Sequence, residues 1–323
     1  MSSAAEPTRA SRPVGGLAAV VVAAAVWGTT GTATHFAPGV PAFVFGAVTF
    51  GLGGVVLAAS AGRGAVVAIR DRATRGWVLL GAASLAVYAV VFYAALAGAG
   101  VALGTTIAIG SSPVFAGLVE WAAERRRVGG RWVVSAVISV LGMATVASAR
   151  SEDPGAPGSL TVGIAAALLA GLTYALYSWA VARGMRAVAA PAGIAARQDR
   201  AGLVAPVGRG LVGAVFGLAA VPLVVLVAVA GHEYLADAGK WPVFLYLALV
   251  PTVLGHTLYA SGLRTVSASA ATLLSLLEPV VAAVLAVLVV GEHLGVTGWV
   301  GIGLVVAGLG VLALPGRTAR RGP

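Results

Sequence analysis

The chain has 323 residues, of which 59% are hydrophobic and 10% charged, and its formal net charge is +10. An ordinary soluble domain carries about 25% charged residues, so this composition excludes a water-exposed surface of normal polarity and indicates a membrane protein. The absence of cysteine excludes disulfide bonds, thiolate metal sites and cysteine nucleophiles.

Apolar stretches long enough to cross a bilayer, which takes about 20 residues, recur along the sequence. In chain order they predict ten helices, at roughly 15–34, 41–60, 77–97, 102–123, 132–149, 160–181, 210–230, 242–262, 267–290 and 296–314. The first stretch follows Arg9 and Arg12 and could be a cleaved signal peptide. Its length, and the odd helix count that its loss would leave, favour a retained helix. The expected fold class is an all-α integral membrane protein.

Basic residues mark the loops between these helices. Cytoplasmic loops of membrane proteins are enriched in Lys and Arg, and an N-terminus inside the cell places 19 of the 21 basic residues in cytoplasmic segments. These are Arg9, Arg12, Arg63, Arg70, Arg72, Arg75, Arg125, Arg126, Arg127, Arg131, Arg183, Arg186, Arg197, Arg200, Arg209, Arg264, Arg317, Arg320 and Arg321. The pattern predicts a multi-pass protein of the plasma (inner) membrane with both termini cytoplasmic, and disfavours nucleic-acid binding.

An internal repeat relates the two halves of the chain. A shift of 166 positions aligns FYAALAGAGVALGTTIAIGSSPVFAG, from Phe92, with LYASGLRTVSASAATLLSLLEPVVAA, from Leu258. Without gaps, Tyr93 meets Tyr259 and Pro113 meets Pro279. Each half would contain five helices, and an odd number makes the second copy enter the membrane from the opposite side. Such inverted repeats recur in secondary transporters, whose substrate sites lie near the bilayer midplane.

The repeat predicts the organisation of the chain. We expect a cytoplasmic N-tail (1–14), a first five-helix repeat (15–149), a periplasmic or extracellular linker (150–159), a second five-helix repeat (160–314) and a basic cytoplasmic tail (315–323). The second repeat includes a cytoplasmic loop at 183–209, whose Pro, Gly and Arg content predicts a flexible linker.

Several stretches give the chain a resemblance to a known family. LLSLLEPVVAAVLAVLVVGEHLG (273–295), AVWGTTGT (25–32) and IGSSPVFAGLVEW (109–121) resemble the EamA-type transporters of the drug/metabolite transporter superfamily. The resemblance covers nearly the whole chain. It implies two five-helix repeats and the export of amino acids or other metabolites, although import of small solutes also occurs in the family. The first repeat has Ser112 where the second has Glu278, which leaves a single carboxylate at this depth.

Glu278 and Pro279 are the first candidates for a functional site. A carboxylate at the centre of a membrane helix costs about 2.5–3.5 kcal/mol on insertion scales. Pro279 also frees the backbone carbonyl of Ser275, which a protonated Glu278 or the Ser275 hydroxyl could satisfy. Two interpretations stay open: the pair only kinks its helix, or Glu278 faces the transport cavity and binds a substrate amine or a proton. Ser112 and Pro113 would form the equivalent kink.

Other polar and aromatic residues inside the spans complete the candidate site. His256 could bind substrate or protons, or it could simply bond to a neighbouring carbonyl. Aromatic side chains inside the spans could line a pocket, and those chosen as candidates are Trp27, Tyr93, Tyr174, Tyr177 and Tyr259, with Tyr88 and Trp179 nearby in sequence. Glu120 is predicted to direct its carboxylate toward the basic cluster at 125–127.

These patterns predict a secondary transporter of a small polar or amphipathic metabolite. The sequence has no P-loop, so transport would be coupled to a proton, another ion or a substrate gradient. The histidines lack metal-ligand spacing, and no metal or cofactor is expected. A channel or a lipid- or nucleotide-sugar-type translocase is the alternative. An intramembrane enzyme is disfavoured because such chemistry usually needs paired acid and base groups, and no catalytic residue is predicted.

The charge distribution generates a topology prediction. Reporters that are active only in the cytoplasm should work when fused after Arg72, Arg127 or Arg200, and should fail when fused after Pro38, Asp153 or Asp237. Reporter activity in cells measures this directly. The reverse pattern would contradict both the topology and the inverted repeat.

Overall fold

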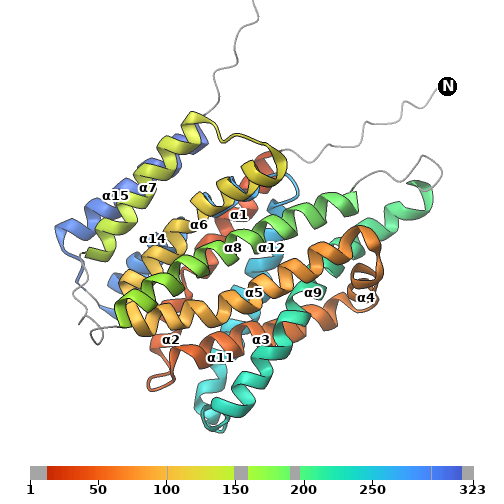
Figure 1. The fold of residues 1–323 in the computed structure, drawn as a ribbon. Coiled ribbons are helices and arrows are strands. Elements are labelled where there is room, and N and C mark those ends of the chain that lie inside the picture. The colour runs from red at the N-terminus through yellow and green to blue at the C-terminus, as the bar shows by residue number, and fades with distance from the viewer. Residues whose placement is uncertain (1–12, 100, 149–158, 190–196, 292, 315–323) are drawn as a thin grey trace, which may run out of the picture.

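The computed structural model describes residues 13–99, 101–148, 159–189, 197–291 and 293–314. Over these residues the chain is a bundle of helices, and no strand occurs among them (Figure 1). Ten helical segments are long and apolar enough to cross a membrane, which confirms the predicted number. The predicted N-tail up to residue 12, the linker at 150–158 and the tail at 315–323 lie outside the described residues.

The helices of the first repeat are α1 (Pro13–Trp27), α2 (Thr30–His35), α3 (Ala42–Ala61), α4 (Arg63–Arg70), α5 (Arg72–Ala99), α6 (Val101–Glu124) and α7 (Gly130–Ser148). Those of the second are α8 (Ser159–Ala189), α9 (Arg197–Ala230), α10 (His232–Leu235), the short η2 (Ala238–Lys240), α11 (Trp241–Leu247), the π-helical η3 (Ala248–Gly255), α12 (His256–Gly262), α13 (Ala268–Leu274), α14 (Leu277–Leu285), the π-helical η4 (Ala286–Val290) and α15 (Val296–Ala313).

Three of the ten spans are interrupted. The first breaks between α1 and α2, where the Thr29 hydroxyl donates to the Val26 oxygen at 2.7 Å. The eighth widens into the π-helical turns of η3 around Pro251. The ninth breaks between α13 and α14, just before Glu278. Irregular backbone at membrane depth is tolerated where it is buried in protein or lines a cavity, so these breaks point to the interior of the bundle.

Helix extends further than the sequence predicted at two places. The segment 183–209 was expected to be a flexible linker, but α8 continues to Ala189 and α9 begins at Arg197, leaving 190–196 outside the described residues. Alanine and arginine are good helix formers, which favours extension of both helices beyond their apolar part. Residues 63–70, expected in a loop, form the helix α4, whose Ala65 and Ala68 are buried.

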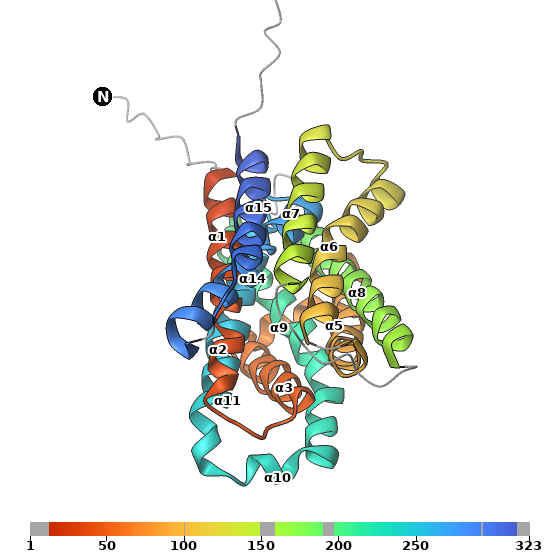
Figure 2. The same cartoon turned by 90° about the vertical axis from the view of Figure 1, so that its left-hand side faces the viewer.

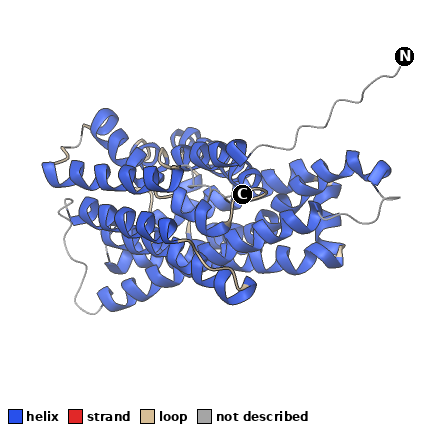
Figure 3. Cartoon of the chain, turned by 90° about the horizontal axis from the view of Figure 1, so that it is seen from above, coloured by secondary structure: helices blue, strands red, loops and turns tan. Residues whose placement is uncertain are grey.

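The two halves pack against each other in matched pairs. α3 packs on α9, α7 on α15, and α6 on α13, so that these helices meet their counterparts in the other repeat. α5 packs along α8, and the corresponding pair, α12 and α1, is also in contact. Figures 1 and 2 both show α7 and α15 side by side, and Figure 3 shows the bundle from above. This pairing of equivalent helices from the two halves is consistent with the inverted repeat predicted from the sequence.

Small residues allow the closest of these pairs to form. A Cβ atom on Gly142 of α7 would lie 2.7 Å from the backbone oxygen of Gly301 of α15, and a Cβ on Gly301 would lie 2.7 Å from that of Gly142. Ser135 of α7 donates to the Gly308 oxygen at 2.5 Å. Close backbone approach through glycine and serine is the usual way in which membrane helices associate.

Alanine at Gly301 should therefore force α7 and α15 apart. We expect Gly301→Ala to lower the free energy of unfolding by about 1–3 kcal/mol, as overpacking does. A Cβ on Gly303, in the same helix, would have no atom within 4 Å, so Gly303→Ala should be neutral or stabilise by up to about 1 kcal/mol. Thermal unfolding of the purified variants compares the two. Equal melting temperatures would contradict a close α7–α15 contact.

Candidate functional site

The break before Glu278 follows from the missing N–H of Pro279. This nitrogen cannot bond to the carbonyl oxygen of Ser275 four residues earlier. The backbone N–H of Glu278 donates to that oxygen instead, at 2.9 Å. The Ser275 hydroxyl donates to the Ala271 oxygen at 3.0 Å. The expectation that the side chain of Glu278 or Ser275 would satisfy the freed carbonyl was therefore wrong.

The equivalent proline of the first repeat is accommodated differently. Pro113 frees the oxygen of Ile109, and the Ser112 hydroxyl donates to this oxygen at 2.8 Å. The helix α6 therefore runs through Pro113 without a break. A serine next to proline can reach back to the preceding turn, and both Ser112 and Pro113 are buried on α6.

Glu278 is half-buried within the ninth span. Tyr174 of α8 lies near this part of the ninth span, because its hydroxyl group is 3.2 Å from that of Ser275. Within the part of the chain that the structure describes, no hydrogen bond or ion pair to this carboxyl group occurs. A carboxylate at this depth must face protein or water. Glu278 is therefore the candidate group for binding a cation or a proton.

The aromatic rings of Trp27, Tyr88, Tyr174, Tyr177, His256 and Tyr259 form one cluster beside Glu278, which we call the aromatic cluster. The ring centroids of Trp27 and Tyr259 are 5.1 Å apart, and those of Tyr88 and Tyr174 are 5.5 Å apart. α1 and α5 of the first repeat and α8 and α12 of the second supply these rings. The cluster therefore spans the interface between the repeats.

Hydrogen bonds fix most members of the aromatic cluster. The Trp27 indole donates to the Pro251 oxygen in η3 at 2.9 Å. Tyr259 donates to the Ser178 hydroxyl at 2.9 Å, and Tyr174 shares a hydrogen bond with the Ser275 hydroxyl at 3.2 Å.

Two further members of the aromatic cluster differ in their partners. His256 Nδ1 lies 3.2 Å from the Thr252 oxygen, as expected for a histidine that bonds to its own helix. The buried Tyr177 hydroxyl has no partner in the described part of the chain. Hydrogen bonds therefore hold most rings of the cluster in place, while the Tyr177 hydroxyl is a buried donor without a partner in the described part of the chain.

Two phenylalanines complete the cluster and were not singled out from the sequence. Phe50 of α3 and Phe216 of α9 lie 5.8 Å and 4.7 Å from the His256 ring, measured between centroids. The available signal was the rarity of phenylalanine, which occurs 8 times in the chain. Their position inside apolar spans gave no reason to separate them from ordinary core residues.

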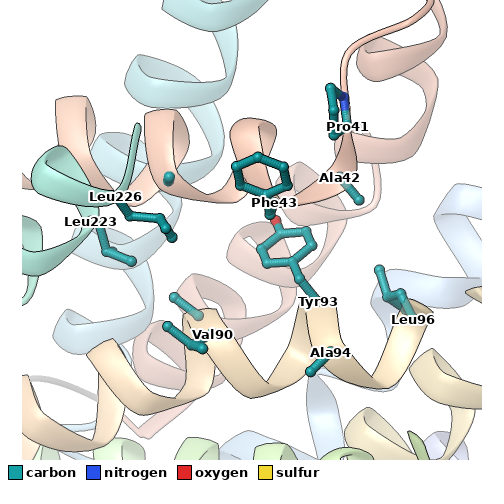
Figure 4. Close-up of a pocket in the computed structure, with 11 residues that line it drawn as sticks. Pro41, Ala42, Phe43, Val90, Tyr93, Ala94, Leu96, Leu223 and Leu226 are labelled. Atoms are coloured by element: carbon teal, nitrogen blue, oxygen red, sulfur yellow. The ribbon is translucent and has the colours of Figure 1, made fainter. Parts of the chain in front are cut away.

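Tyr93 lies in a different environment from its repeat equivalent Tyr259. Its ring packs on α3 so closely that a Cβ on Gly46 would lie 1.8 Å from it. Figure 4 shows Tyr93 pointing toward Phe43 at a pocket of about 510 Å³ between α3, α5 and α9. The other lining residues are apolar: Pro41, Ala42, Phe43, Ala47, Ala89, Val90, Ala94, Leu96, Leu223 and Leu226. The Tyr93 ring contacts Phe92, which stacks on Tyr88 of the aromatic cluster.

A second set of polar side chains joins the repeats at one end of the bundle. Glu124, the last residue of α6, accepts a hydrogen bond from the Trp179 indole at 2.7 Å. Arg183 and Arg186 of α8 each approach its carboxylate to 3.8 Å. The Arg183 guanidinium also lies over the ring of Trp77 in α5, 5.7 Å from its centroid. We call these five residues the Glu124 cluster.

Glu120, one turn earlier in α6, does not join the Glu124 cluster. It was predicted to point toward the basic residues 125–127, but its carboxylate is buried and accepts hydrogen bonds from Ala268 and Ser269. The N–H groups at the start of a helix attract a carboxylate, and this attraction turns Glu120 toward α13 instead.

The chain matches known proteins over most of its length. Residues 209–314 match the EamA-like transporter family. An uncharacterized transporter of Bacillus subtilis (strain 168), YwfM, is 32% identical over 302 residues, which cover 91% of this chain and 92% of YwfM. The chain belongs to the EamA-like transporter family. One solved crystal structure shares its fold, with a TM-score of 0.74, 22% sequence identity and coverage of 94% of this chain and 97% of the other.

Membership of the EamA-like family identifies the chain as a membrane transporter. An EamA-like transporter is a multi-pass membrane protein that moves a small molecule, and the ten apolar helices agree with this. Its polar groups at membrane depth are expected to face the interface between helices. In this chain Glu278 and the aromatic cluster lie at such an interface.

The Trp27–Pro251 hydrogen bond should stabilise the aromatic cluster. Trp27→Phe removes the indole N–H that donates to the buried Pro251 oxygen, so we expect the free energy of unfolding to fall by about 1–3 kcal/mol. Trp121, which is 51% exposed on α6, provides the control. Trp121→Phe should change stability by no more than about 0.5 kcal/mol. Thermal melts followed by far-UV circular dichroism measure both, and equal losses would contradict a specific role for the indole N–H.

Proposed function

We propose that this chain is a secondary transporter that exports a small metabolite carrying an amine, such as an amino acid, by alternating access at the interface between its repeats. The observation that carries the proposal is the Glu278 carboxyl group. It lies half-buried in the ninth span, three residues after Ser275, whose hydroxyl group bonds to Tyr174, and it has no hydrogen-bond or ion-pair partner in the described part of the chain.

The groups around Glu278 fit an amphipathic cation. A carboxylate attracts an ammonium group, and the faces of tryptophan and tyrosine rings attract cations and pack on apolar groups. The hydroxyl groups of Tyr174 and Ser275, which are bonded to each other, can offer hydrogen bonds to a carboxylate or carbonyl of the solute. An amino acid presents all of these features.

The same carboxyl group provides a means of coupling. We propose that Glu278 binds either a proton or the amine of the solute, but not both at once. Outward movement of the solute would then be exchanged for inward movement of a proton, since each displaces the other from one site. No further ion is required by this scheme.

Alternating access requires the two ends of the bundle to open in turn. We propose that the Glu124 cluster closes the cytoplasmic end, because its arginines belong to the segments that the charge distribution places inside the cell. The chain would lie in the plasma (inner) membrane with both termini cytoplasmic. Opening this end would separate Arg183 and Arg186 of α8 from Glu124 of α6.

The function is tested first in cells. Overproduction should raise tolerance to at least one toxic amino acid or amine analogue and lower its intracellular concentration, because an exporter removes it. Mass spectrometry of cell extracts across a panel of such solutes measures the effect. Equal intracellular levels throughout the panel, with membrane insertion verified, would contradict export.

The same solute then tests the site in liposomes that contain the purified protein. Glu278→Gln keeps the shape and removes the charge, so we expect flux to fall at least tenfold, which corresponds to about 1.4 kcal/mol. The remaining flux should no longer vary with pH, because an amide does not titrate. Glu233, exposed outside the spans, provides the control Glu233→Gln, which should transport normally. Wild-type flux and pH profile in Glu278→Gln would make Glu278 a structural residue.

A further inference from the structure

Glu120 is a buried carboxylate to which the proposed transport cycle assigns no role. It lies within the membrane-spanning part of α6 and is 2% exposed. Its Oε1 accepts from the backbone N–H groups of Ala268 at 2.8 Å and Ser269 at 3.4 Å, and its Oε2 accepts from the Ser269 hydroxyl at 2.6 Å. All three bonds join the first repeat to the start of α13 in the second.

The first turn of α13 already has a local cap. Ser267 is the N-cap residue, and its hydroxyl accepts from the Ala270 N–H at 3.2 Å. Glu120 satisfies other backbone N–H groups of the same turn, which a helix start leaves without partners of its own. Trp132 of α7 adds a bond from its indole N–H to the Ser269 oxygen at 2.9 Å. Two helices of the first repeat therefore hold this turn in place.

α13 links this anchored turn to the candidate site. It has seven residues, so its length is about 10 Å at 1.5 Å per residue. Directly after it comes Ser275, whose hydroxyl bonds to Tyr174 at 3.2 Å, and after the break comes Glu278. A helix this short is stiff, so a displacement or rotation of its first turn reaches Ser275 with little loss.

We propose that Glu120 is a positioning residue that sets the depth and rotation of α13 and thereby places Ser275 and Glu278 for solute binding. This inference rests on the proposed transport function for its consequence, but its geometric part can be tested separately. Glu120 itself lies at the start of α13, at the opposite end of this helix from Ser275. Its carboxylate suits the task because it accepts from two backbone groups and one hydroxyl group at once.

The geometric test measures the distance between spin labels. The chain has no cysteine, so cysteines introduced at Val137 of α7 and Leu288 of η4, which are 53% and 74% exposed, would be the only labelled sites. In liposomes, Glu120→Ala should shift or broaden the distance distribution measured by double electron–electron resonance. Glu120→Gln keeps an acceptor for Ala268 and should retain the original distribution. Ser267→Ala, which removes the local cap and the contact between the Ser267 and Ser269 hydroxyl groups but leaves the Glu120 carboxylate in place, is the control and should also retain it.

The transport test uses the solute identified for the unlabelled protein. Glu120→Ala should raise KM at least tenfold in correctly inserted protein, with a smaller change in kcat, while Glu120→Gln should stay within threefold of the wild type. A residue that only stabilises the fold would lower the melting temperature without changing KM. An unchanged distance distribution together with an unchanged KM in Glu120→Ala would overturn the proposal.

Two further outcomes also test the role of Glu120. If Glu120→Ala fails to insert, Glu120→Asp, whose side chain is shorter by one methylene, should still shift the distance distribution, and an unshifted one would overturn the proposal. If no solute is transported by the wild type, the proposed function fails, whereas a shifted distribution in Glu120→Ala would still support the positioning of α13. Transport that needs Glu278 but tolerates Glu120→Ala would leave the function intact and refute the role of Glu120.

Discussion

Backbone polar groups at membrane depth must find partners within the protein, because lipid offers none. Proline makes this constraint acute, since each proline in a helix leaves one carbonyl oxygen without its usual donor. Three of the prolines within the described spans meet the constraint in three different ways, through a serine hydroxyl, a threonine hydroxyl and a break in the helix. The corresponding bonds are Ser112 to Ile109, Thr252 to Leu247 and the N–H of Glu278 to Ser275. Among these three places in the described chain, the break is the one with an ionisable side chain, Glu278, next to the proline.

The interface between the repeats is built from two kinds of contact. Glycine and serine bring α7 against α15 with backbone atoms almost touching, whereas large rings fill the space between α1, α5, α8 and α12. Close contacts of the first kind resist separation, while rings can slide or tilt on one another with small changes in contact. An interface with both kinds can keep one pair of helices together while others move, as the proposed alternating access requires. The Glu124 cluster adds charge-assisted contacts at one end, which are weaker where water reaches them.

The sequence predicted the location of a side chain best where that type of side chain is tolerated in few environments inside a membrane. Glu278 and the aromatic residues Trp27, Tyr174, Tyr177 and Tyr259 were chosen as candidates, and the structure brings all five into one region. It failed where a side chain had a choice of partners. Glu120 could reach either a basic cluster or a helix start, and only the placement of α13 beside α6 decided between them. The repeat aligns Tyr93 with Tyr259, but the two residues have different neighbours: Tyr93 lines the apolar pocket, whereas Tyr259 bonds to Ser178.

The sequence by itself determined the number of helices and their approximate ends, and it predicted two similar halves, with which the packing of the helices is consistent. These features depend on local hydrophobicity and on spacing along the chain, which a linear pattern records. The tertiary structure alone decided which carbonyl each polar side chain would satisfy, which helix ends would be held by the other repeat, and which carboxylate would remain free. Those outcomes depend on distances of a few ångströms between residues far apart in the sequence, such as Glu120 and Ala268 or Trp27 and Pro251. Hydrogen bonds fall off steeply with distance and angle, so no pattern of residue types along the chain could have fixed them.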